Sequence, residues 1–89
     1  MNSQATERFW KAYQNLPPHI QRKARETYQL WQQNPYHPSL QFKQIHPTKP
    51  IYSVRVGIGW RTMGIKSNDT MVWFWIGSHA EYDRLISQL

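Results

Sequence analysis

The sequence contains no cysteine, which excludes disulfide bonds and thiol chemistry and is compatible with a cytosolic compartment. No stretch approaches the ~18 consecutive apolar residues of a membrane span, and the polar start Met1-Asn2-Ser3-Gln4 is unlike a signal peptide. We therefore expect a soluble, cytoplasmic protein. A chain of 89 residues has room for one hydrophobic core, so residues 1–89 should form a single domain.

Acidic residues are also scarce, because five Asp and Glu stand against eleven Lys and Arg and give a formal charge of +6. In so short a chain this surplus favours a polyanionic partner, either nucleic acid or an acidic protein. A membrane surface fits less well, since the most cationic helix lacks a strongly apolar opposite face. Charge alone does not separate the first two partners.

The motifs of metal and cofactor sites are missing. The four histidines are scattered and have no carboxylates at ligand spacing. The segment Gly57-Ile58-Gly59 lacks the remaining positions of a nucleotide-binding fingerprint. We expect neither a metal ion nor a cofactor.

The C-terminal segment has the clearest pattern. Residues 71–76 are apolar, β-branched and aromatic, which is typical of a strand buried on both faces, while periodicity alone is also compatible with a buried helix. Ser78 and Glu81 then have the spacing of a capping box, and apolar residues recur at helical spacing after it. This pattern makes His79 the first residue of a helix, where unpaired backbone N–H groups point outward.

The N-terminal third predicts an αα-hairpin. Residues 1–7 carry no pattern and are expected to be frayed or loosely extended. A first helix over residues 9–16 should end before Pro17-Pro18, and a second should run from near Pro18 to about Gln33, where Asn34-Pro35 stops it.

Short turns join three further segments, at residues 42–45, 51–56 and 60–66, which predicts antiparallel neighbours. The expected fold is α/β (α+β). An N-terminal helical hairpin packs on one face of a roughly four-stranded antiparallel sheet, and a C-terminal helix closes the fold. The other face should be open. Alternation in the central strand places Tyr52, Val54 and Val56 on one face, and Ile51, Ser53 and Arg55 on the other. If Tyr52 and Val54 face the helices, Ser53 and Arg55 lie on the open face.

Arg55 and Arg61 flank the Gly57-Ile58-Gly59 turn, so their side chains can reach one phosphate from adjacent strands. The alternative is a pair of ordinary solvated arginines, and the alternation does not decide which face carries Arg61. The cations Arg22, Lys23 and Arg25 on the second helix are either a solvated face or a weak sign of an external anion.

His79 is the candidate for proton transfer, because a neutral imidazole beside a phosphate can act as general acid or base. Asp83 follows one helical turn later and can orient the ring. The alternative is a histidine that only packs at a helix start. Tyr82 belongs to the apolar stripe, which favours core packing over a hydroxyl directed toward the open face.

Several segments together resemble the small toxins of the RelE/ParE superfamily, in its HigB-like branch. The most specific is Ile76-Gly77-Ser78-His79-Ala80-Glu81-Tyr82-Asp83. The others are Tyr52-Ser53-Val54-Arg55-Val56, Trp60-Arg61-Thr62-Met63-Gly64, Trp73-Phe74-Trp75, Asn34-Pro35-Tyr36-His37-Pro38-Ser39-Leu40 and Leu16-Pro17-Pro18.

The resemblance implies a toxin of a bacterial type II toxin–antitoxin pair, with an antitoxin protein as partner. One implied activity is metal-independent endoribonuclease cleavage of mRNA, often on the ribosome. The other is inhibition of DNA gyrase without cleavage. An orphan relative without catalytic activity is a further alternative. Nuclease members imply Arg55 and Arg61 as phosphate ligands and His79 or Tyr82 in proton transfer.

The family's lysines before the central strands have counterparts here only in Lys43 and Lys49, beside His46, and we assign the two lysines to substrate binding. The family's strand ahead of the hairpin has no evident counterpart in residues 1–8.

Overall fold

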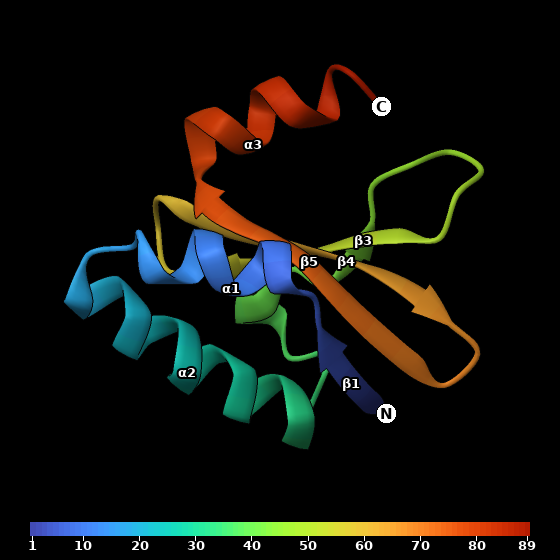
Figure 1. The fold of residues 1–89 in the computed structure, drawn as a ribbon. Coiled ribbons are helices and arrows are strands. Elements are labelled where there is room, and N and C mark those ends of the chain that lie inside the picture. The colour runs from blue at the N-terminus through green and yellow to red at the C-terminus, as the bar shows by residue number, and fades with distance from the viewer.

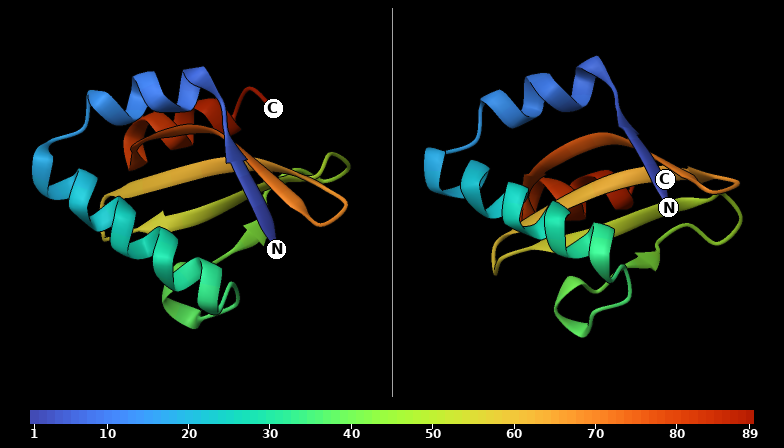
Figure 2. Two further views of the ribbon diagram at one scale, coloured as in Figure 1. Left: turned by 60° about the horizontal axis from the view of Figure 1, so that its bottom comes forward. Right: turned by 90° about the horizontal axis from the view of Figure 1, so that it is seen from below.

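The computed structural model describes all of residues 1–89. The chain forms a five-stranded sheet in the order β1-β5-β4-β3-β2, with α1 and α2 on one face and α3 on the other (Figures 1 and 2). In sequence order the elements are β1 (Asn2–Ala5), α1 (Glu7–Gln14), α2 (Pro18–Gln33), the 3-10 helix η1 (Pro38–Leu40), β2 (Lys43–Gln44), β3 (Ile51–Val56), β4 (Trp60–Ser67), β5 (Thr70–Ser78) and α3 (His79–Ile86). None of the helices has the length and apolar character needed to cross a membrane.

The N-terminus corrects one expectation, because residues that should have been frayed form the edge strand β1. It runs parallel to β5, and the backbone N–H groups of Asn2 and Thr6 donate to the carbonyls of Asp69 and Trp73 at 2.8 and 2.9 Å. The sheet is therefore mixed and five-stranded instead of antiparallel and four-stranded, and a strand does precede the hairpin. Backbone hydrogen bonds hold this short strand in the sheet. Its side chains are mostly polar, so no alternating hydrophobic pattern marks it in the sequence.

The helical hairpin is confirmed. The Thr6 side chain caps α1 by accepting from the Phe9 N–H at 3.1 Å, and α2 begins at Pro18, a residue suited to the first helical turn. The helix α2 ends at Gln33, and Asn34 is its non-helical C-cap, as the steric restriction of a residue before proline predicts.

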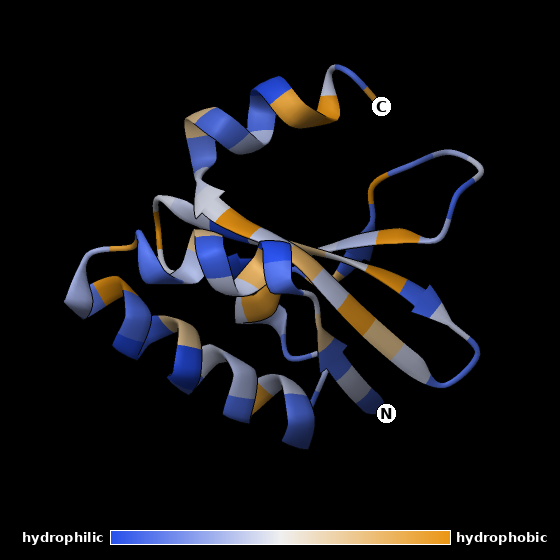
Figure 3. Ribbon diagram, viewed as in Figure 1, coloured by the Kyte–Doolittle hydropathy of each residue, from blue (hydrophilic) through white to orange (hydrophobic).

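The main core lies between this hairpin and the sheet. One cluster joins Trp31 and Leu40 to residues of β3 and β5, and a second joins Leu16 and Ile20 to Val56 and Ile76. Figure 3 shows apolar positions along the strands, while much of the helix surface is hydrophilic. Val54 and Val56 lie in these two clusters, so the expected orientation of β3 is confirmed.

The opposite face is not open beneath α3, which corrects a second expectation. Tyr82 of α3 packs with Met63 and Trp75. Ser53 is only 2% exposed and accepts a hydrogen bond from the Tyr82 hydroxyl at 3.1 Å. The capping box turns the chain back immediately after β5, and this return lays Tyr82 over the sheet.

A β-bulge at Phe74 divides the aromatic run of β5 between the two faces. Pairing changes from Met63↔Trp75 to Gly64↔Trp73, which leaves Phe74 without a partner. Trp73 consequently meets Trp31 under the hairpin, while Trp75 packs under α3. Gly64 is required here, since a Cβ would stand 2.8 Å from both Met71 Cε and Trp73 Cε3.

Candidate functional site

Arg55 and Arg61 lie side by side on the α3 face of the sheet. They are register partners between β3 and β4, and Arg61 also pairs with Gly77 of β5. Directly opposite residues of antiparallel strands point to the same face. The next row on that face contains Ser53 and Met63, which lie beneath α3. The register therefore settles the face of Arg61, which the sequence left undecided.

Neither guanidinium has a carboxylate partner. Arg55 donates from Nε to the Gly57 carbonyl at 3.1 Å, and Arg61 donates from Nη1 to the Trp60 carbonyl at 2.9 Å. The Arg61 guanidinium carbon also lies 5.9 Å from the centroid of the Tyr82 ring. Each guanidinium has five donor N–H bonds. Most of them remain available to an anion.

His79 is the first residue of α3, as its sequence position predicted. Its backbone N–H donates to the Gly59 carbonyl at 2.8 Å, so the helix start is tied to the turn that follows Arg55. Its Nδ1 lies 3.1 Å from Asp83 Oδ2, and the imidazole side chain is 45% exposed. Asp83 thus orients the ring as expected and leaves Nε2 for another partner.

Tyr82 contributes its ring to the site but directs its hydroxyl inward. The residue is 6% exposed, and its hydroxyl donates to Ser53 in the sheet. The core-packing alternative is therefore the one observed. The centroids of the His79 and Tyr82 rings are 5.9 Å apart, so the tyrosine forms a wall beside the histidine.

The two lysines assigned to substrate binding lie in different places. Lys43 is exposed and pairs with Ser53, so it shares the face of the arginine row. Lys49 lies in the loop before β3, whose first residue, Ile51, pairs with Ile65 at the far end of the strand from Arg55. This loop and the start of α3 lie on opposite sides of Figure 1. Lys43 therefore lies on the same face as Arg55 and Arg61, whereas Lys49 lies at the far end of β3 from them.

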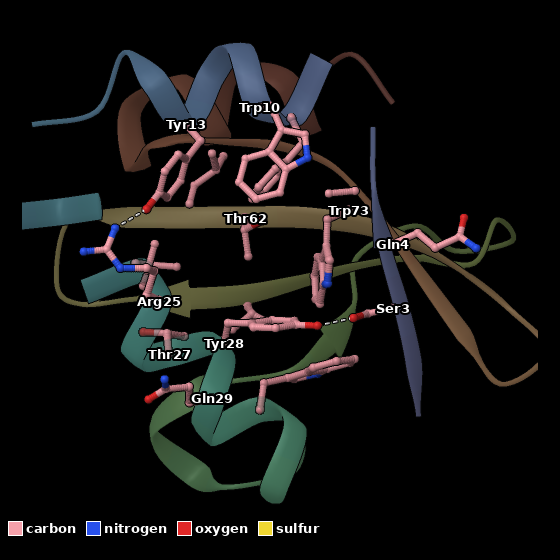
Figure 4. Close-up of a pocket in the computed structure, with 17 residues that line it drawn as sticks. Ser3, Gln4, Trp10, Tyr13, Arg25, Thr27, Tyr28, Gln29, Thr62 and Trp73 are labelled. Carbon is pink, nitrogen blue, oxygen red and sulfur yellow. Dashed lines mark hydrogen bonds between the residues drawn. The ribbon is translucent and has the colours of Figure 1, made fainter. Parts of the chain in front are cut away.

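A cavity that the sequence did not predict lies on the other face, between α1, α2 and the sheet. Its volume is about 420 Å³ and its walls are mainly apolar (Figure 4). Arg25 donates to the Tyr13 hydroxyl at 2.6 Å across it, and Tyr28 contacts Ser3. Trp10 is 50% exposed on α1. The sequence carries no signal for this cavity, because it depends on how far the two helices stand apart.

The sequence matches the ParE-like toxin domain over residues 18–84. The chain belongs to this family. No match was found among curated protein sequences. The family assignment agrees with the superfamily resemblance noted above, while the HigB-like branch stays a prediction.

Three solved structures show the same fold. The RelB–RelE antitoxin–toxin complex from Methanococcus jannaschii shares 20% identity over 91% of this chain and 96% of that chain, with a TM-score of 0.73. YafQ from E. coli strain BL21(DE3) shares 13% identity over the same fractions, with a TM-score of 0.73. The toxin–antitoxin complex RelBE2 from Mycobacterium tuberculosis shares 17% identity over 88% and 96% of the two chains, with a TM-score of 0.71.

Proposed function

We propose that this protein is the toxin of a bacterial type II toxin–antitoxin pair and cleaves mRNA without a metal ion. The observation that carries the proposal is the row of Arg55 and Arg61, free of carboxylate partners and close to the start of α3. Membership of the ParE-like toxin domain family supports the toxin assignment. The cytoplasm, where mRNA is translated, is the compartment in which we expect it to act.

The proposed reaction is an internal transfer at one phosphate of the RNA chain. The ribose 2′-hydroxyl attacks the adjacent phosphorus, the bond to the 5′-oxygen of the next nucleotide breaks, and a 2′,3′-cyclic phosphate and a 5′-hydroxyl result. Arg55 and Arg61 stabilise the charge that develops on the phosphoryl oxygens. The 2′-hydroxyl loses a proton and the departing 5′-oxygen gains one. His79 takes part in this proton transfer, and Asp83 holds its ring.

We further propose an acidic antitoxin as the protein partner. Two of the similar structures are toxin–antitoxin complexes, RelB–RelE from Methanococcus jannaschii and RelBE2 from Mycobacterium tuberculosis. In this chain, an acidic segment that buries Arg55 or Arg61, or displaces α3, would neutralise the phosphate ligands and compete with RNA. Affinity for the antitoxin should therefore fall in the Arg55→Ala/Arg61→Ala variant.

The alternative function is a non-catalytic toxin such as a DNA gyrase inhibitor, which the ParE-like character of the matched domain favours. Induced expression followed by mapping of RNA 5′ ends separates the two. We expect new ends within mRNAs for the wild type and none for Arg61→Ala. Assays on free and ribosome-bound mRNA then decide whether the ribosome is required. Toxicity with unchanged RNA ends and inhibited supercoiling would contradict the nuclease proposal.

A further inference from the structure

A second cavity, of about 460 Å³, lies beside the unpaired edge of β3, near the C-terminal end of that strand. Its walls come from α2, η1 and the turn between β3 and β4, and Arg55 is part of them. The strand β2 pairs only with Tyr52 and Ser53, so the edge of β3 that faces away from β4 is uncovered beyond Ser53. The surface around Arg55 therefore continues past the sheet edge to α2.

Lys23 of α2 and Arg55 of β3 converge on Gly57. Arg55 Nε donates to the Gly57 carbonyl at 3.1 Å. A Cβ built on Gly57 would stand 3.6 Å from Lys23 Cγ and 3.9 Å from Lys23 Cε, so the aliphatic stem of the lysine lies along the turn. Gly57 also has φ of +65°, a conformation that glycine adopts without strain. One turn thus positions two cationic side chains that are far apart in sequence.

The charges around this turn are not balanced within the protein. The ion pairs of the chain are Lys11–Glu7 and His79–Asp83, and neither involves Lys23 or Arg55. Glu26 lines the same cavity but makes no ion pair with either cation. A single carboxylate facing two cations leaves net positive charge beside the proposed cleavage site.

We propose that Lys23 holds a second phosphate of a single-stranded RNA, the one next to the phosphate bound by Arg55 and Arg61. The RNA then runs from His79 across the arginine row and around the β3–β4 turn to α2. This inference rests on the proposed function and adds the path that the RNA strand takes over the protein surface. It also gives a role to one member of the Arg22, Lys23 and Arg25 group on α2.

The chemistry of the two subsites differs. A guanidinium can bind phosphate oxygens through two parallel hydrogen bonds and so fixes their orientation, whereas an ammonium acts as a point charge. Lys23 should therefore supply affinity for the strand and little of the rate of bond cleavage. Successive negative charges along a flexible strand fit the series Arg61, Arg55 and Lys23, which runs from the central strand β4 through β3 to the exposed surface of α2.

The test measures binding apart from cleavage. Fluorescence anisotropy would follow a labelled RNA octamer and a dinucleotide, both carrying 2′-O-methyl groups that block the attacking hydroxyl. We expect Lys23→Ala to weaken octamer binding about 3- to 10-fold and to lower the salt dependence by roughly 0.7 in log–log slope, as loss of one phosphate contact should. Dinucleotide binding should stay unchanged, and Lys23→Arg should restore the octamer.

Arg22→Ala is the matched control, because Arg22 is an exposed cation on the same helix that does not line the cavity. Octamer binding by Lys23→Ala equal to that by Arg22→Ala would overturn the subsite. It would also be overturned if Lys23→Ala weakened binding of the antitoxin but not of RNA. Failure of the wild type to bind either RNA, together with no new mRNA 5′ ends after induced expression, would instead refute the proposed function, so the two failures are distinct.

Discussion

The two faces of the sheet differ in polarity and burial near Arg55, although β3 contributes side chains to both. Val54 and Val56 point into the core under the helical hairpin, while Arg55 between them points to the α3 face and has no carboxylate partner. The hairpin face has an apolar cavity, and the α3 face has uncompensated positive charge beside a half-exposed histidine. Because successive residues of a strand point to opposite faces, neighbouring residues of β3 contribute to the core and to the proposed catalytic site. The comparison predicts that changes to buried side chains of either face affect folding, whereas changes to the free polar side chains of the α3 face affect cleavage.

The largest effects should come from two buried tryptophans, Trp31 under the hairpin and Trp75 under α3. Trp31 is 1% exposed and contacts Trp73 and Phe42, so Trp31→Ala should lower the free energy of unfolding by about 3–5 kcal/mol. Trp75→Ala should cost a similar amount, because Trp75 packs with Met63 and Tyr82. Denaturant melts measure both. Losses below about 1 kcal/mol would show that these residues are not core.

On the α3 face, Arg61→Ala should reduce the cleavage rate about 10²- to 10³-fold, as loss of a donor to developing charge does. Its unfolding free energy should change little, since Arg61 makes no ion pair. Arg84→Ala, an exposed cation on α3, is the control and should cleave normally. Equal rates for the two variants would mean that Arg61 is an ordinary surface arginine.

His79→Ala should slow cleavage by about 10²-fold through loss of the proton-transfer group. Asp83→Asn should have a smaller effect, because it weakens the orientation of the ring without removing it. Single-turnover cleavage of a short RNA gives both rates. A larger loss for Asp83→Asn than for His79→Ala would point to the carboxylate as the reacting group.

The smallest effect should come from Tyr82→Phe, which tests whether the tyrosine hydroxyl is structural. Removing its hydrogen bond to Ser53 should cost about 0.5–1.5 kcal/mol in unfolding free energy. Cleavage should remain well above the rate of His79→Ala, because the ring stays in place beside Arg61. A cleavage loss as severe as that of His79→Ala, with unchanged stability, would assign the proton transfer to Tyr82.

Local signals predicted the parts of this structure that depend on neighbouring residues. The capping box of Ser78 and Glu81 placed His79 correctly, and the Pro17-Pro18 break separated the two helices. These features arise from backbone geometry within one or two turns. The pairing of Arg55 with Arg61 followed from a short turn between two strands.

Features that depend on distant pairing were not predicted. Strand β1 is held by backbone bonds to β5, almost seventy residues away in sequence, and its own side chains carry no pattern. The bulge at Phe74 puts Trp73 and Trp75 on opposite faces of the sheet, whereas strict alternation would put both on the same face. The cover of α3 over Ser53, the remote position of Lys49 and the closeness of Lys23 to Gly57 likewise depend on tertiary packing.

The most direct test of the central claim is analysis of the ends that the purified protein leaves on a defined RNA in the presence of a metal chelator. Mass spectrometry should find a 2′,3′-cyclic phosphate on the upstream product and a 5′-hydroxyl on the downstream product. Neither should form with the Arg55→Ala/Arg61→Ala variant, provided that it melts as the wild type does. Products from the folded double variant at the wild-type rate, or cleavage abolished by the chelator, would contradict a metal-independent site built on these arginines.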